Sequence, residues 1–136
     1  MNTIKEIAQK LKQAQSVLLF PHVHMDGDAL GSSAALAGAL RKQGKTCYVL
    51  IEDEIAGNLK FLDRDYCTDN QDIIDDPDLC VYIDCGDESR IPKRYGKFLS
   101  GRETMCIDHH RTNSSDTDYA YVAADAAATG EIIYDI

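Results

Sequence analysis

The sequence has no apolar run approaching the roughly 20 residues that a membrane helix needs. It also has no apolar centre of a secretion signal, because its start, MNTIKEIAQKLKQAQ, is charged and amphipathic. Its 5 cysteines are odd in number and form no CxxC pair, which argues against a disulfide framework and a zinc ribbon. Cys47, Cys80 and Cys106 lie in or beside apolar runs, as small core residues do. We therefore expect a reduced, cytoplasmic protein that does not associate with membranes.

Positive charge is also scarce. The chain has 14 Lys and Arg against 23 Asp and Glu, a net charge of -9. Binding long nucleic acid through its backbone needs a basic stripe, and the sequence contains none. The net charge does not exclude a small anionic substrate, provided that cations are supplied at its site. The acidic segment 63–78 has scattered aspartates and turn residues, so we expect a solvated loop there rather than a site.

Helical and strand patterns alternate along the 136 residues, a length that suits one domain. Helical spacing or composition marks four segments: residues 3–15, 29–44, 57–62 and 130–136. Short continuous apolar runs predict four strands covered on both faces: residues 16–20, 46–51, 79–83 and 103–107. This order predicts an α/β fold, a doubly wound and mainly parallel sheet with helices on both faces.

The polar side chains cluster directly after three of the predicted strands, the edge at which such sheets bind ligands. All 4 histidines fall in two of these clusters: His22, His24, His109 and His110. Four aspartates accompany them: Asp26, Asp28, Asp84 and Asp108. The carboxylates would repel one another, and the clusters contain no lysine or arginine, so divalent cations would offset that repulsion. A mixed carboxylate and imidazole set suits Mn²⁺, with Mg²⁺ or Co²⁺ as alternatives.

The spacing within Asp26-Gly27-Asp28 suggests two ions rather than one. The two carboxylates are close enough to serve neighbouring ions but awkwardly placed to chelate a single ion. A third aspartate from another strand is then available to bridge them. Two ions roughly 3.5–4 Å apart clamp a phosphate and acidify a water between them. The helix that begins near Ala29 directs its amide dipole to the same place, which favours phosphate.

Three motifs in order resemble the DHH phosphoesterase superfamily: PHVHMDGDALGS, VYIDCGDESRI and IDHHRTN. Within it they are most similar to the nanoRNases, also described as bifunctional oligoribonucleases and pAp (3′-phosphoadenosine 5′-phosphate) phosphatases. The resemblance implies a Rossmann-like DHH domain that hydrolyses short oligonucleotides, pAp or both with a water activated by two Mn²⁺ ions. Cyclic dinucleotide hydrolysis and pyrophosphate hydrolysis are alternatives within the superfamily. A non-catalytic metal- or nucleotide-binding module is an alternative of another class.

The resemblance also assigns roles to residues. It implies five metal ligands: His22, Asp26, Asp28, Asp84 and His109. Among these, Asp84 would bridge the ions. It makes His110 and Asp108 catalytic, with Asp108 orienting a histidine, and it places His110 and Arg111 at the substrate. For two residues of the second motif, Asp87 and Arg90, two roles stay open: a structural ion pair with each other, or contact with the substrate.

The resemblance further implies that the DHH domain, residues 1–136, is truncated at its C-terminal end and that a second, substrate-binding domain is absent. The family's last metal aspartate would lie beyond Ile136, with Asp125 a weak candidate to replace it. His24 lies where the family varies, which makes it a neighbour of the site. We expect the predicted helix at residues 130–136, cut at its end, to expose Ile132, Ile133 and Ile136. A homodimer is compatible with the sequence, and no protein partner is evident.

Overall fold

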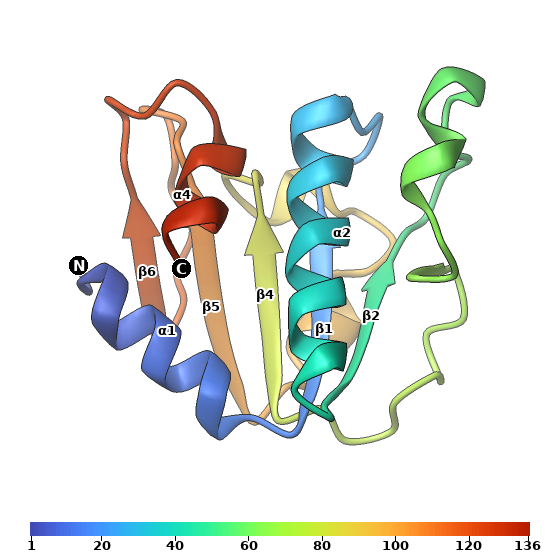
Figure 1. The fold of residues 1–136 in the computed structure, drawn as a ribbon, viewed down its shortest axis with the longest axis horizontal. Helices are drawn as coiled ribbons and strands as arrows, with labels where there is room; N and C mark the ends of the chain where they lie inside the picture. Colours follow the sequence, from blue (N-terminus) through green and yellow to red (C-terminus); the bar gives the residue numbers. More distant parts are fainter.

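Six parallel strands form one sheet in the computed structural model, which describes all of residues 1–136 (Figure 1). In chain order the strands are β1 (Ser16–Pro21), β2 (Thr46–Leu50), β3 (Cys67–Thr68), β4 (Leu79–Ile83), β5 (Glu103–Asp108) and β6 (Tyr119–Val122). Their order across the sheet is β3-β2-β1-β4-β5-β6, and every neighbouring pair is parallel. The predicted doubly wound α/β sheet is confirmed.

Helices cover both faces of this sheet, as predicted. The elements are α1 (Ile4–Gln13), α2 (Gly27–Lys42), η1 (Gly57–Leu62), η2 (Glu88–Arg90), α3 (Tyr95–Phe98) and α4 (Thr129–Asp135). Helices α1, α2 and α4 lie on one face (Figure 1), whereas the opposite face packs against the short α3 and the segment before it. Helix α1 carries the predicted capping box, in which Thr3 and Glu6 each accept a hydrogen bond from the other's backbone N–H.

The strands are apolar on both sides because each side faces a separate core. In β1, Leu19 packs beneath the three longer helices, whereas Phe20 points to the other face. There the ring of Phe98 lies edge-on to Phe20 and stacks on Tyr82 at a centroid distance of 3.9 Å. Successive residues of a strand point to opposite faces, and both faces are apolar here. This explains why the strands have continuous apolar runs in the sequence. The predicted core cysteines are buried and free: Cys47, Cys80 and Cys106.

Several features differ from the sequence prediction, among them the short η2 and α3, which fall where no helix was predicted. Strand β6 falls where no strand was predicted, because its side chains are only half-buried and form no continuous apolar run. The acidic segment contains the two-residue β3 but is otherwise loop and turn. Helix α2 begins at Gly27 rather than Ala29, since the Asp26 carboxylate accepts a hydrogen bond from the backbone N–H of Ala29 and caps the helix.

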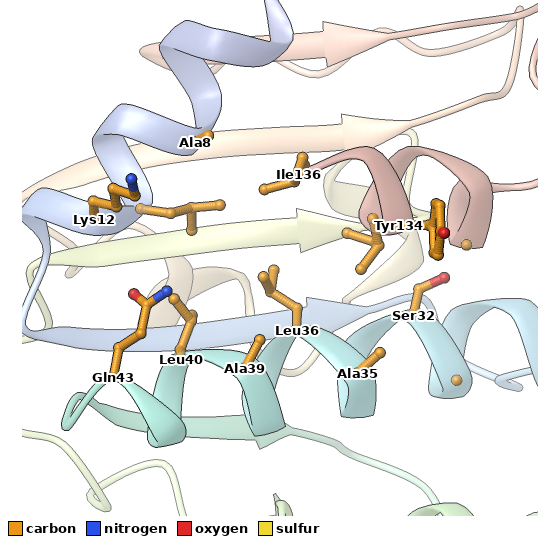
Figure 2. A pocket seen from close by; sticks show the side chains of 14 residues that line it. Ala8, Lys12, Ser32, Ala35, Leu36, Ala39, Leu40, Gln43, Tyr134 and Ile136 are labelled. Carbon is orange, nitrogen blue, oxygen red and sulfur yellow. The ribbon is translucent and has the colours of Figure 1, made fainter.

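The last helix hides part of the apolar surface that we expected it to expose. Ile132 is buried against the sheet, so that expectation is wrong for Ile132. Ile133 and Ile136 are half-buried and line an apolar recess of about 370 Å³ between α1, α2 and α4 (Figure 2). No Asp, Glu or His side chain lines this recess, which therefore offers no group for the predicted chemistry. None of the helices is long and apolar enough to span a membrane.

Candidate metal centre

The order of the strands brings the predicted polar clusters together. After β1 the chain builds β2 and β3 on one side of β1 and then places β4 on its other side. Such a reversal opens a crevice at the carboxyl ends of the strands. His22 follows β1, Asp84 follows β4, and Asp108 ends β5, so three adjacent strands deliver side chains to one edge. The convergence expected from the sequence is present.

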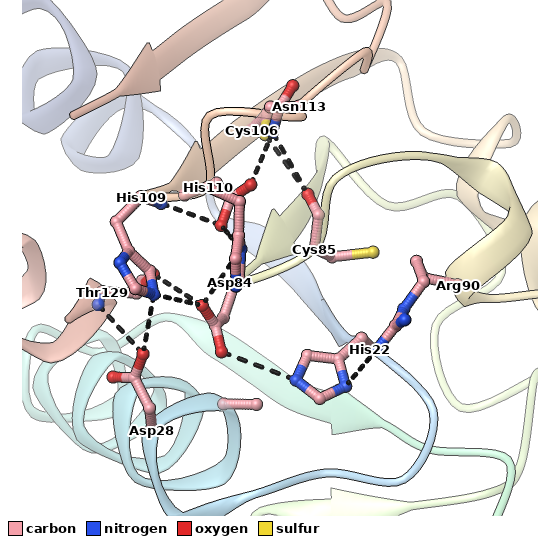
Figure 3. Close-up of polar contacts among 12 residues, drawn as sticks. His22, Asp28, Asp84, Cys85, Arg90, Cys106, His109, His110, Asn113 and Thr129 are labelled. Carbon is pink, nitrogen blue, oxygen red and sulfur yellow. Dashed lines mark hydrogen bonds and ion pairs between the residues drawn. The ribbon is translucent and has the colours of Figure 1, made fainter. Parts of the chain in front are cut away.

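Asp84 lies at the middle of the cluster and its side chain is only 2% exposed. One carboxylate oxygen, Oδ2, is 3.5 Å from His22 Nε2, and the other, Oδ1, is 3.3 Å from His109 Nε2 (Figure 3). The backbone of Asp84 has a φ of 55°, a left-handed conformation that costs free energy in most residues and that Asp tolerates better than most. Asp84 therefore presents a different oxygen to each of two groups of side chains.

The first group contains His22 and Asp26. Its ligand atoms, with one oxygen of Asp84, all lie within 4.8 Å of one another. The Nδ1 of His22 is 2.6 Å from the carbonyl oxygen of Val23 and donates to it, which leaves Nε2 facing the carboxylates. The hydrogen bond to Asp84 raises the pKa of His22, although burial acts in the opposite direction. The carboxylates thus favour a positive charge at this position.

The second group contains His109 and Asp28. His109 Nε2 is 3.5 Å from Asp28 Oδ2, in addition to its contact with Asp84. The Asp28 carboxylate also accepts hydrogen bonds from the backbone N–H groups of Thr129 and Gly130 at the start of α4. The ligand atoms of Asp84, His109 and His110 all lie within 4.8 Å of one another, whereas Asp28 joins this group through its contact with His109. The Nδ1 of His110 is engaged elsewhere, however, so only its Nε2 is free to bind a ligand.

Asp108 holds the two adjacent histidines. It is fully buried, and its Oδ1 accepts hydrogen bonds from the backbone N–H of His109 at 2.8 Å and from Nδ1 of His110 at 2.6 Å. Its Oδ2 accepts from the side-chain amide of Asn113 at 2.7 Å. Because a carboxylate only accepts, Nδ1 of His110 carries the proton in this contact. These contacts fix the ring of His110, and the catalytic part of the role predicted for Asp108 stays a prediction.

A polar recess lies beside the first group. Nine residues line it: His22, Asp26, Asp84, Gly86, Asp87, Ser89, Arg90, His110 and Thr112. Arg90 is its only lysine or arginine, whereas the predicted Arg111 is exposed and does not line it. Arg90 makes no ion pair with Asp87; its guanidinium lies 3.3 Å from His22 Nδ1. Asp87 instead caps η2 by accepting from the backbone N–H of Ser89.

Two further candidates lie outside the centre. The side chain of His24 is 91% exposed and lies 3.5 Å from Asp53, away from both groups of potential ligands. Asp125 is exposed in the loop before α4 and belongs to neither group of potential ligands. Two contacts of the centre were not predicted from the sequence: the hydroxyl of Thr129 contacts Asp84, and the side-chain amide of Asn113 contacts Asp108. Asn113 ends the motif IDHHRTN and Thr129 begins the last helix, but neither local pattern reveals these contacts.

The fold and these motifs define the class of protein. Residues 16–136 match the DHH family, N-terminal domain, and the chain belongs to this family of phosphoesterases. It is 27% identical over 139 residues to the probable bifunctional oligoribonuclease and PAP phosphatase NrnA of Streptococcus mutans, covering 99% of this chain and 42% of that protein. It is 26% identical over 131 residues to the NrnA of Bacillus subtilis, covering 96% and 41% respectively. The chain thus spans less than half the length of these curated relatives.

Solved structures share the fold. An exopolyphosphatase-related protein from Bacteroides fragilis matches with a TM-score of 0.87 and 20% identity, over 97% of this chain and 42% of that one. The exonuclease RecJ, in a structure described as bound to manganese, matches with a TM-score of 0.62 and 16% identity, over 98% and 36%. At these identities the likeness concerns the arrangement of the strands and helices.

Proposed function

We propose that the chain is the catalytic DHH domain of a metal-dependent phosphoesterase that hydrolyses short oligonucleotides, pAp or both. The observation that carries this proposal is the position of Asp84, whose two oxygens face two separate sets of carboxylate and imidazole groups. His22 and Asp26 would hold one ion, Asp28 and His109 the other, and Asp84 would contact both. When bound, two such ions lower the pKa of a water and offset the negative charge of a phosphate.

The chemistry of the donors supports Mn²⁺, with Mg²⁺ or Co²⁺ as substitutes. The cluster offers only oxygen and imidazole nitrogen, and this combination suits borderline divalent ions. The thiols near the site are buried, and burial raises the pKa of Cys85 to about 12, so a thiolate is not available there. Two carboxylates beside buried His22 also need positive charge nearby, which a cation would supply.

The polar recess supports an anionic substrate. Arg90 places a positive charge beside His22, and Thr112 adds a hydroxyl donor in the same recess. Asp108 accepts a hydrogen bond from Nδ1 of His110 and fixes the orientation of its ring, which would leave Nε2 free for proton transfer with a bound substrate. The choice of short oligonucleotides and pAp follows from the relatives, which are named as oligoribonuclease and PAP phosphatase.

A side-by-side assay tests this proposal. The chain, in excess over substrate and with Mn²⁺, is incubated with pApA, pAp, cyclic di-AMP and pyrophosphate. We expect Mn²⁺-dependent release of AMP from pApA and of phosphate from pAp, faster than turnover of the other two. Asp84→Asn should abolish this release, and its effect should be larger than that of Asp87→Asn, which leaves the proposed metal ligands intact.

Two results would contradict the proposal at different levels. Turnover of pyrophosphate at an equal or greater rate would overturn the substrate class and favour a pyrophosphatase. No metal-dependent turnover of any of the four substrates, together with a single bound ion that does not involve His22 or His109, would instead favour the non-catalytic binding module.

A further inference from the structure

Thr129, the first residue of α4, contacts two of the proposed metal ligands at once. Its side chain is fully buried, and its hydroxyl donates to Asp84 Oδ1 at 2.9 Å (Figure 3). Its backbone N–H donates to Asp28 Oδ2 at 3.0 Å, and that of Gly130 donates to Asp28 Oδ1 at 2.9 Å. We propose that Thr129 is a positioning residue that sets the orientation of both carboxylates. This inference rests on the proposed function.

The hydroxyl acts on the orientation of the bridging carboxylate. The torsion that rotates a carboxylate is soft, so Asp84 by itself has no strong preference for the orientation seen here. The hydrogen bond from Thr129 holds Oδ1 on the side of His109 and thereby turns Oδ2 toward His22. Thr129 can enforce this because it is β-branched and buried, which restricts its own rotamers. One lone pair of Oδ1 accepts from the hydroxyl, and the other stays free for a cation.

The backbone of the same residue acts on the second carboxylate. Helix α4 has no side-chain cap of its own, since its N-cap residue is Ala128. Asp28, which comes from α2, accepts hydrogen bonds from the first two backbone N–H groups of α4 and so caps this helix from another one. This contact holds Asp28 Oδ2 within 3.5 Å of His109 Nε2. A shift of Thr129 would therefore displace Asp28 and Asp84 together.

Two substitutions at one position separate the hydroxyl from the bulk of the side chain. Thr129→Val keeps the shape but removes the donor, whereas Thr129→Ser keeps the donor. The matched control is Ser33→Ala, because Ser33 is also fully buried but its hydroxyl donates to the backbone of Ala29 and to no carboxylate. Mn²⁺ affinity is measured by calorimetry, and the thermal midpoint without metal is measured for each variant.

We expect Thr129→Val to weaken Mn²⁺ binding about 10-fold or more, the loss typical when a partner of a metal ligand is removed. Thr129→Ser and Ser33→Ala should bind within about 3-fold of the unchanged chain, whatever their thermal midpoints. Equal Mn²⁺ affinity in Thr129→Val and the unchanged chain would overturn this inference alone. So would an equal loss in the valine and serine variants, or in the Ser33 control. An unchanged chain that binds no Mn²⁺ would overturn the proposed function as well.

Discussion

Asp84 combines an unusual backbone conformation, burial and contacts to side chains that follow two other strands. Asp84→Asn would replace one carboxylate oxygen with an amide that donates, and would remove the charge that both halves of the centre share. We expect the largest loss of Mn²⁺ affinity among single substitutions, measured by calorimetry. Asp87→Asn is the control, because Asp87 caps η2 and contacts no proposed ligand. Comparable Mn²⁺ affinity in Asp84→Asn and the unchanged chain would refute the bridging role.

His109 and His110 should respond differently to removal although they are adjacent. His109 Nε2 lies between Asp28 and Asp84, so His109→Ala should weaken Mn²⁺ binding. His110 is held by Asp108 and lines the polar recess, so His110→Ala should mainly lower the turnover rate. Calorimetry and the pApA assay on both variants distinguish these effects. If His110→Ala loses the metal while His109→Ala keeps it, the two roles are reversed.

The sequence predicted which residues gather at the site better than it predicted their supporting contacts. His22, Asp84 and His109 follow apolar strands, a pattern that can be recognised locally, and the sheet brings them together. The contact of Thr129 with Asp84 joins residues 45 positions apart, and a lone threonine at a helix start has an ordinary local explanation. Arg90 likewise reaches His22 across 68 positions. Only the packed chain could reveal these two contacts.

At the scale of secondary-structure elements, α4 depends on a residue of α2 for its cap. Asp28→Ala removes the acceptor for two backbone N–H groups and should lower the free energy of unfolding by about 1 kcal/mol in the absence of metal. Urea denaturation measures the effect, with the exposed Asp125→Ala as control. An unchanged free energy of unfolding in Asp28→Ala would show that the cap contributes no stability.

Helices and strands were predictable where a single local sequence pattern marked them clearly. The buried strands β1 and β4 have continuous apolar runs, and α1 has a complete capping box, so both kinds of element were identified. Strand β6 was missed because tyrosines at an edge strand stay half-buried and polar contacts help to hold it, such as the one from its Ala120 N–H to the Asn2 side chain. Tertiary packing, rather than local propensity, determines such a strand.

At the scale of the whole molecule, the buried thiols make stability sensitive to alkaline pH. Burial raises the pKa of Cys47 from 9.0 to about 12, and three other cysteines share this shift to about 12: Cys67, Cys80 and Cys85. The folded chain therefore retains protons that the unfolded chain loses above pH 9. The free energy of unfolding should be fully retained below pH 9 and should fall as the pH rises toward 12.

Urea denaturation at a pH on either side of the thiols' ordinary pKa measures this loss. A Cys47→Ala variant is the control, and its free energy of unfolding should fall less between the two pH values, because one titrating thiol is missing. An identical fall in the variant and the unchanged chain would show that the Cys47 thiol does not contribute to the alkaline instability.

Anomalous diffraction from crystals grown with Mn²⁺ shows whether the Asp84 carboxylate joins two metal sites. We expect two anomalous peaks roughly 3.5–4 Å apart, one beside His22 and Asp26 and the other beside Asp28 and His109, with Asp84 between them. A single peak, or peaks that do not contact Asp84, would contradict this expectation.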